Sequence, residues 1–202
     1  MRDLVVIDLE TTSLDPLTAR VIEIGAVRLP QWTEFRVAID PDGAYAIDPA
    51  ALAVNRYEER RAGGEWDGAI GEHEALTRLR AFAEGAAAAF YGAAFDAPFL
   101  DAAERRRGLA PRREWGRRAL DLPSLAWAMG VEADATWVRR RSDGRRWSGA
   151  GVAVPSLARA SEALEVEAPR PGERHTALGD ARAAARVVWA LTFGWGSRRA
   201  TD

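Results

Sequence analysis

Cysteine and lysine are both missing from this chain of 202 residues, and each absence narrows what it can do. Without cysteine the chain forms no disulfide and binds no metal through thiolates. A cytoplasmic location is the simplest interpretation. All 28 basic residues are arginines. Their use together with abundant alanine is typical of a GC-rich genome, and the preference of guanidinium groups for phosphate is the second explanation.

Long apolar runs and a strong net charge are missing as well. No run approaches the roughly 20 apolar residues that span a membrane, and the N-terminus lacks a basic segment followed by an apolar one. We therefore expect no membrane partner and no secretion signal. The net charge of −2 argues against a protein that coats long nucleic acid by releasing counterions, but it permits an enzyme that acts on a strand end. A hydrophobic content of 48% supports one well-filled domain.

The chain opens with a strand signal that leads into two acids. Residues 4–7 are all apolar, which predicts a strand buried on both faces. Asp8 and Glu10 follow two positions apart, so their carboxylates project from one face of the strand, about 7 Å apart along the chain. Two such carboxylates repel each other, and a divalent cation relieves the repulsion. The alternative is a pair of solvated acids at an exposed strand end.

The rest of the chain alternates strand and helix signals. Strands are predicted over residues 20–29, 33–39, 87–91 and 119–121, and helices over 71–85, 96–107, 123–129, 154–164 and 177–191, with a short helix from Asp48-Pro49. Three antiparallel strands followed by alternating strands and helices predict an α/β domain with a mixed sheet. Its active edge is expected where strands end and loops converge.

Two further acids and a histidine lie at predicted helix starts. Asp96 follows the strand over residues 87–91, where a helix N-cap would explain it without any function. Asp180 falls in the first turn of the closing helix, where it is favourable to the helix dipole. Thr176 is a suitable N-cap for that helix, which leaves His175 on the preceding loop. Each residue alone therefore has a purely structural explanation.

Together these residues resemble the DEDDh, or DnaQ-like, 3′–5′ exonucleases, which include the epsilon-type proofreading subunits of DNA polymerase III. The resemblance rests on Asp8-Leu9-Glu10-Thr11-Thr12-Ser13-Leu14-Asp15 with Val21-Ile22-Glu23-Ile24-Gly25-Ala26-Val27, on Phe95-Asp96 with Phe99-Leu100, and on the His175-x4-Asp180 spacing. It covers roughly residues 4 to 192. Two positions depart from the pattern: Ser13 replaces the usual glycine, and Gly92 replaces the usual asparagine.

The resemblance implies a ribonuclease H-like fold, a mixed five-stranded sheet flanked by helices, formed by one domain over residues 1–193 with a polar tail over 194–202. It also implies two Mg²⁺ or Mn²⁺ ions, which suit oxygen-only ligands, and hydrolysis that releases nucleoside 5′-monophosphates from a 3′ end. His175 would be the general base. The implied metal ligands are Asp8, Glu10, Asp96 and Asp180, and the implied contacts to the 3′-terminal nucleotide are Thr11, Thr12, Leu14 and Phe95.

Arginine-rich segments lie outside these motifs. Residues 131–153 fit no core element, and their Asp143-Gly144 pair between matched arginines and tryptophans predicts an inserted β-hairpin. Its arginines either bind the phosphates of a nucleic-acid strand or cover the hairpin's own tryptophans. The four arginines that would bind the nucleic acid are Arg139, Arg140, Arg145 and Arg146. Residues 105–107, at a helix end, are expected to form a solvated basic surface.

The expected partner is single-stranded DNA with a free 3′ end, in proofreading or DNA repair. An RNA or oligoribonucleotide exonuclease of the same fold is one alternative. A non-catalytic scaffold that binds nucleic acid or a polymerase is another, although all five site residues are present. A DNA polymerase partner is possible under the resemblance, but the tail from Gly194 contains no obvious docking segment.

Overall fold

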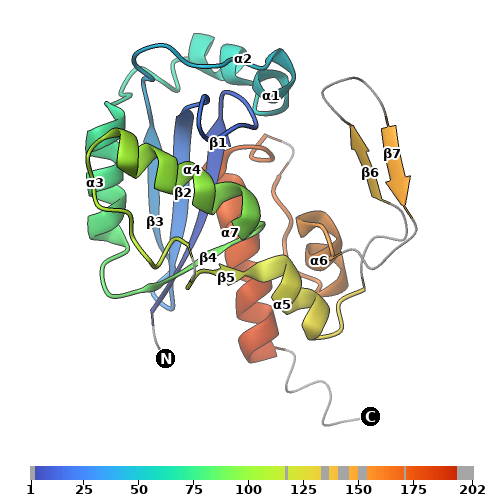
Figure 1. Ribbon diagram of the computed structural model, residues 1–202. Coiled ribbons are helices and arrows are strands. Elements are labelled where there is room, and N and C mark those ends of the chain that lie inside the picture. The colour runs from blue at the N-terminus through green and yellow to red at the C-terminus, as the bar shows by residue number, and fades with distance from the viewer. Residues whose placement is uncertain are drawn as a thin grey trace, which may run out of the picture.

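A five-stranded sheet forms the centre of the chain (Figure 1). The computed structural model describes residues 3–194 apart from 117, 133–136, 141–145, 150–153 and 171, and for residues 137–140, 146–149 and 193–194 it describes the backbone alone. The strands are β1 (Leu4–Thr11), β2 (Val21–Leu29), β3 (Thr33–Ala38), β4 (Ala87–Phe90) and β5 (Leu120–Asp121), in the order β3-β2-β1-β4-β5. β2 pairs antiparallel with β1 and β3, whereas β4 pairs parallel with β1 and β5. The predicted mixed sheet is confirmed.

Helices cover both faces of this sheet. α3 (Glu72–Phe82) and α4 (Ala93–Arg106) pack on one face, where Leu79 and Leu100 join the buried side chain of Ile7. α5 (Leu122–Ala128) and α7 (Ala177–Trp189) pack on the other face, where Val188 joins Val6. α6 (Leu157–Ala163) packs against α5 and α7. The two layers put α4 and α7 on opposite sides of β1 (Figure 1).

A glycine sets how closely α7 approaches the sheet. A Cβ atom on Gly25 of β2 would lie 2.2 Å from the backbone carbon of Ala177, a distance that no real side chain tolerates. The first turn of α7 therefore rests directly on β2, next to β1. Because Thr176 accepts a hydrogen bond from the backbone N–H of Gly179, that turn also has the expected N-cap.

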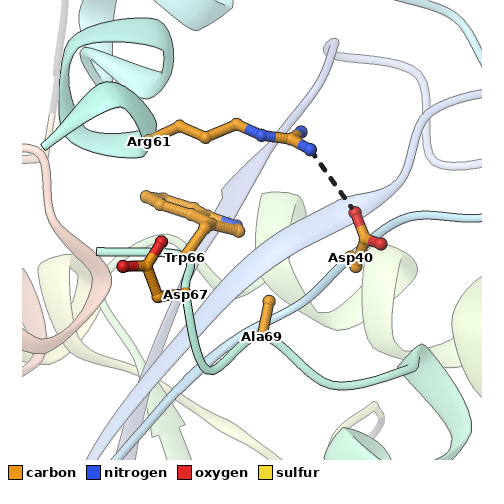
Figure 2. A pocket seen from close by; sticks show the side chains of 5 residues that line it. All are labelled: Asp40, Arg61, Trp66, Asp67 and Ala69. Carbon is orange, nitrogen blue, oxygen red and sulfur yellow. Dashed lines mark ion pairs between the residues drawn. The ribbon is translucent and has the colours of Figure 1, made fainter. Parts of the chain in front are cut away.

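Two short helices cover the end of the sheet where β1 finishes (Figure 1). α1 (Pro49–Val54) begins with Asp48 as its N-cap, as predicted. α2 (Tyr57–Ala62) was not predicted, because its sequence is mostly charged and buries only Tyr57 and Arg60. Beside it lies an open hollow of about 370 Å³, in which the Arg61 side chain extends above the Trp66 ring toward Asp40 (Figure 2).

Several element boundaries differ from the sequence prediction, most clearly those of α4, α6 and α7. α4 begins at Ala93, with Gly92 at φ 118° as its N-cap, so Asp96 lies inside the first turn and is not the cap. α6 begins at Leu157 after its N-cap Ser156, not at residue 154. After α7 the chain continues as a π-helical turn, Ala190–Gly194.

The expected solvated surface at residues 105–107 is wrong for two of its three arginines. Arg105 is exposed and pairs with Asp101. Arg106 and Arg107 are largely covered and both bind the buried carboxylate of Glu72, at 2.5 Å and 2.6 Å. The cause is Glu72 itself, an acid buried at the start of α3 that must be neutralised.

The segment predicted as a hairpin contains two paired strands. β6 (Trp137–Arg140) and β7 (Arg146–Gly149) pair antiparallel in a separate two-stranded sheet, with Arg140 opposite Arg146. Their connecting turn, which includes Arg145, lies outside the described residues. No helix among the described residues is long and apolar enough to cross a membrane.

Candidate active site

Three of the predicted acids converge at the end of β1. Asp8 and Glu10 project from the face of β1 that also carries Val6, toward α7. Asp180 comes from the first turn of α7. One carboxylate oxygen from each of the three lies within 4.8 Å of the others. We call Asp8, Glu10, Asp180 and the neighbouring Asp96 the acidic cluster.

Asp96 reaches this site from the opposite helical layer. It lies in the first turn of α4 and is buried, with 3% of its surface exposed. The backbone of Leu9 forms a hydrogen bond with its carboxylate, which fixes Asp96 beside β1. Its charge is one of those that raise the pKa of Asp8. Two helices from opposite faces therefore bring acids to one strand.

His175 stands at the rim of the site. Its Nδ1 lies 3.9 Å from Oδ2 of Asp180, and nearly half of its side chain is exposed. The residue has a left-handed backbone with φ 57°, which turns the chain from the preceding loop into α7. Its backbone also forms a hydrogen bond with the Asp180 carboxylate. His175 is thus next to the acids and accessible to a water molecule or a substrate.

The acidic cluster is electrostatically strained in the absence of cations. Burial, followed by repulsion from Asp96, Glu10 and Asp180, raises the pKa of Asp8 well above its usual range. Burial, with repulsion from Glu23 and Asp180, raises the pKa of Glu10 to about 8. Burial raises the pKa of Asp96 to about 8, and burial also raises the pKa of Asp180. Such a group of carboxylates is a ready site for hard divalent cations.

A fifth carboxylate, close to the acidic cluster, has a different environment. Glu23 of β2 lies opposite Glu10 and is fully buried. Its oxygens accept hydrogen bonds from Arg36 at 2.6 Å, from Arg60 at 2.8 and 2.9 Å, and from the backbone N–H of Ala177 at 3.2 Å. Glu23 is therefore neutralised by protein groups, and it joins α2 and the start of α7 to β2.

Sequence reasoning missed Glu23, Arg60 and Asn55 as supporting residues of this site. Asn55 is buried between α1 and α2 and donates its side-chain N–H to the carbonyl of Thr11. A hydrogen bond from Asn55 also lowers the pKa of Glu10, against the larger effect of burial. Glu23 stood within a quoted motif, but Asn55 and Arg60 lie in a charged segment whose sequence carries no signal of burial.

The predicted substrate contacts fall into two groups. Thr11 and Thr12 are buried, and their hydroxyls donate to the carbonyls of Ser13 and Ala46. They hold the loop after β1 in place. Leu14 and Phe95 are exposed, and the Phe95 ring packs on that of Phe99 with centroids 4.9 Å apart. For the remaining predicted contacts, Arg139, Arg140 and Arg146, the structure describes only the backbone, and Arg145 lies outside the described residues.

The arrangement defines an α/β domain with an acidic cluster and a histidine at the end of its central strand. The family model described as exonuclease, RNase_T, matches residues 5–188. The chain therefore belongs to this exonuclease family. No curated protein matches the sequence.

Solved structures of exonuclease I share the fold. The structure of E. coli exonuclease I in complex with a dT13 oligonucleotide has a TM-score of 0.67 and 15% identity, over 98% of this chain and 42% of that chain. Exonuclease I from Methylocaldum szegediense has a TM-score of 0.66 and 17% identity, over 96% of this chain and 42% of that chain. This chain thus spans less than half the length of either protein. The implied ribonuclease H-like fold is confirmed.

Proposed function

We propose that this chain is a divalent-metal-dependent 3′–5′ exonuclease that removes nucleoside 5′-monophosphates from the 3′ end of DNA. The observation that carries the proposal is the acidic cluster, in which carboxylates from β1, α4 and α7 meet beside His175. Two findings support it. The chain belongs to the exonuclease family, and its fold is similar to that of E. coli exonuclease I, one structure of which is a complex with a dT13 oligonucleotide.

The donor set fits Mg²⁺ or Mn²⁺. Four carboxylates offer only oxygen ligands, and burial raises the pKa of each, with repulsion from neighbouring acids adding to the effect at Asp8 and Glu10. The four acids of the cluster would hold two such ions. When bound, the ions neutralise the charge that develops on the phosphate during hydrolysis.

His175 is the proposed general base. Its imidazole lies at the rim, next to Asp180 but not hydrogen-bonded to it, so a nitrogen is free to accept the proton of the attacking water. The hydrogen bond between the His175 backbone and the Asp180 carboxylate fixes the position of the proposed base relative to a proposed metal ligand. The half-exposed position lets the imidazole pass its proton to solvent after each cycle.

We place the 3′-terminal nucleotide between the loop after β1 and the start of α4. Leu14 and Phe95 are exposed apolar side chains in these two segments, and both suit contact with a base or sugar. Thr11 and Thr12 form the floor, since their hydrogen bonds fix the loop that carries Leu14. The hairpin arginines Arg139, Arg140, Arg145 and Arg146 remain proposed contacts to the rest of the strand.

Degradation of a 5′-labelled single-stranded oligonucleotide with Mg²⁺ tests the proposal. The expected product is a ladder that shortens from the 3′ end and that EDTA or Asp8→Ala abolishes. Asp67→Asn is the matched control, because Asp67 lies in the hollow beside Trp66, lined by none of the cluster residues (Figure 2). An intact oligonucleotide with folded wild-type protein would contradict the proposal and favour a non-catalytic scaffold.

The role of His175 has its own test. His175→Ala is expected to lose most of the rate while calorimetric titration with Mn²⁺ still shows binding, because the imidazole is not among the proposed ligands. Unchanged kinetics would remove His175 from the role of base.

The substrate class is decided by one further comparison. Single-stranded DNA, duplex DNA and RNA of the same sequence are degraded side by side, and we expect single-stranded DNA to be cleaved fastest. Faster cleavage of RNA would favour the alternative of an RNA or oligoribonucleotide exonuclease.

A further inference from the structure

Two residues near the end of β1 have a left-handed backbone although neither is glycine. Arg56, between α1 and α2, has φ 51°, and His175, before α7, has φ 57°. Among the residues that the structure describes, two other non-glycine residues share this property, Trp32 and Glu165. A Cβ atom makes this conformation unfavourable, and such residues gather at functional sites. His175 has a proposed role, whereas Arg56 still lacks one.

The side chain of Arg56 is not what holds α2 in place. Arg56 is the N-cap residue of this helix, but its side chain forms no capping hydrogen bond. Its backbone carbonyl accepts from the N–H of Arg60, and the side chain of Asn55 accepts from the N–H of Tyr57. A glycine at position 56 would keep these backbone contacts with less strain. The presence of an arginine therefore has another cause.

The guanidinium of Arg56 reaches the loop that carries His175. Its Nη2 donates to the carbonyl of Gly172 at 2.7 Å, across 116 positions of the sequence. This loop lies beside α1, at the end of the sheet where β1 finishes (Figure 1). The next residue, Glu173, accepts from Arg182 of α7 at 3.0 Å through its carboxylate. Two arginines from different elements thus hold neighbouring residues of the loop, two positions before His175.

The loop is also packed closely against the first turn of α7. Thr176 Oγ1 donates to the carbonyl of Glu173 at 2.7 Å. A Cβ atom on Gly179 would lie 2.1 Å from that carbonyl oxygen, so the backbone of the loop approaches the helix as closely as only glycine allows. Because the backbone between Glu173 and Gly179 has little room to adjust, a displacement at Gly172 is passed on to His175.

Resting on the proposed role of His175 as general base, we propose that Arg56 is a positioning residue for this base. Its guanidinium binds a backbone carbonyl of the loop and thereby fixes the place of the imidazole relative to the acidic cluster. The adjacent Asn55 donates to the carbonyl of Thr11 at the end of β1. Residues 55 and 56 therefore join the strand that carries two of the acids to the loop that carries the base.

Arg56→Gly separates positioning from stability. The variant loses the guanidinium but suits the left-handed backbone, so its midpoint of urea unfolding is expected to be no lower than that of the wild type. Its kcat on single-stranded DNA is nevertheless expected to fall about tenfold, less than the roughly 100-fold that a 1 Å misplacement can cause, with KM and Mn²⁺ affinity unchanged. Glu165→Gly is the matched control. It relieves the same backbone conformation just after α6 and should leave kcat unchanged.

A double-mutant cycle shows whether the loss passes through His175. In the His175→Ala background, Arg56→Gly is expected to cause no further loss of kcat, because the group that Arg56 positions is already gone. Additive losses would place Arg56 in a separate role, such as contact with a substrate phosphate, and would overturn the proposal. An Arg56→Gly variant with the full rate of the wild type would overturn it as well.

The position of His175 can be followed without activity. The chain has two histidines, and the other, His73, lies in α3. An NMR spectrum of the histidine ring C–H groups in EDTA therefore contains two sets of signals, which His175→Ala assigns. Arg56→Gly is expected to shift or broaden the His175 signals and to leave those of His73 unchanged, and unchanged His175 signals would overturn the proposal. If folded wild-type protein degrades no substrate, the proposed function falls, and this spectrum still decides whether Arg56 positions the loop.

Discussion

Two groups of covered carboxylates in this molecule have opposite surroundings. Glu23, Glu72 and Glu104 are almost fully buried, and each is held by guanidinium groups or other N–H donors. Among the described residues, no arginine is hydrogen-bonded to a member of the acidic cluster. The first group belongs to the framework and the second to the candidate active site.

The two groups of carboxylates differ in whether arginines offset the free-energy cost of their burial. Burying an unpaired carboxylate is expensive, and this chain has 28 arginines with which to neutralise it. It does so at Glu104, which accepts from Arg80, from the backbone of Arg112 and from the Trp115 ring. That no arginine of the described chain forms a hydrogen bond with the cluster is consistent with a site for cations from solution. Stability is given up there for function.

The largest effect is expected from Asp8→Asn. The amide removes one negative charge and one proposed ligand, so kcat/KM on single-stranded DNA is expected to fall more than about 10³-fold. The same variant should be more stable than wild type in EDTA at pH 8, because it removes a carboxylate whose charged form is disfavoured by burial and by repulsion from its neighbours. Exonuclease assays and urea unfolding measure the two effects. A variant that is both inactive and less stable in EDTA would contradict the electrostatic account.

Among the buried carboxylates that are held by arginines or other N–H donors, we expect a substitution to lower the stability of the protein. Arg60→Met leaves Glu23 with Arg36 and one backbone N–H, so the free energy of unfolding is expected to fall by about 3 kcal/mol. The neighbouring Arg61, half of whose side chain is exposed, is the control, and Arg61→Met should cost less than about 1 kcal/mol. Urea unfolding in EDTA measures both. Equal losses would mean that burial of the Glu23–Arg60 pair is not what stabilises this region.

Most of the sheet and the core of the site could be predicted from the sequence, for a local reason. Alternation along β1 puts Asp8 and Glu10 on one face, and the N-cap Thr176 fixes the short step from His175 to Asp180 in α7. Such signals are contained within a few residues. They therefore do not depend on how distant segments pack.

The supporting residues could not be predicted, because their partners are distant in sequence. Arg60 meets Glu23 across 37 positions, and Ala177 meets it across 154. Nothing in the charged segment that forms α2 distinguishes the buried Arg60 from its exposed neighbour Arg61. Similarly, residues 105–107 read as an ordinary basic helix end until the buried Glu72 of α3 is placed beside them.

The metal-free protein is expected to lose stability as the pH rises. Glu10 and Asp96 have ordinary pKa values of 4.5 and 3.8 but values of about 8 in the folded chain. Between these limits the folded state binds more protons than the unfolded state. The stabilisation is complete below the ordinary values and is lost as the pH rises through about 8. The slope is about 1.4 kcal/mol per pH unit for each carboxyl that keeps its proton.

Thermal unfolding in EDTA from pH 5.5 to 8.5, repeated with Mg²⁺, measures this effect. Mg²⁺ should flatten the decline and stabilise more at higher pH, because binding requires the carboxylates to be ionised. Lowered pKa values, such as that of Asp3 beside Arg28, act only below this range and do not interfere. A metal-free stability that rises with pH would contradict the assignment of raised values to the cluster.

The smallest effect is expected where a carboxylate and an arginine pair on the surface. Glu74 and Arg78 of α3 form an ion pair of 2.5 Å, one turn apart, with more than half of each side chain exposed. Because water solvates both groups in either state, Arg78→Ala should change the free energy of unfolding by no more than about 0.5 kcal/mol. Urea unfolding beside Arg60→Met measures the difference. A loss as large as that of Arg60→Met would show that ion pairing alone stabilises the folded protein. The predicted difference between the two variants attributes the stabilisation instead to the burial of the carboxylate that the arginine neutralises.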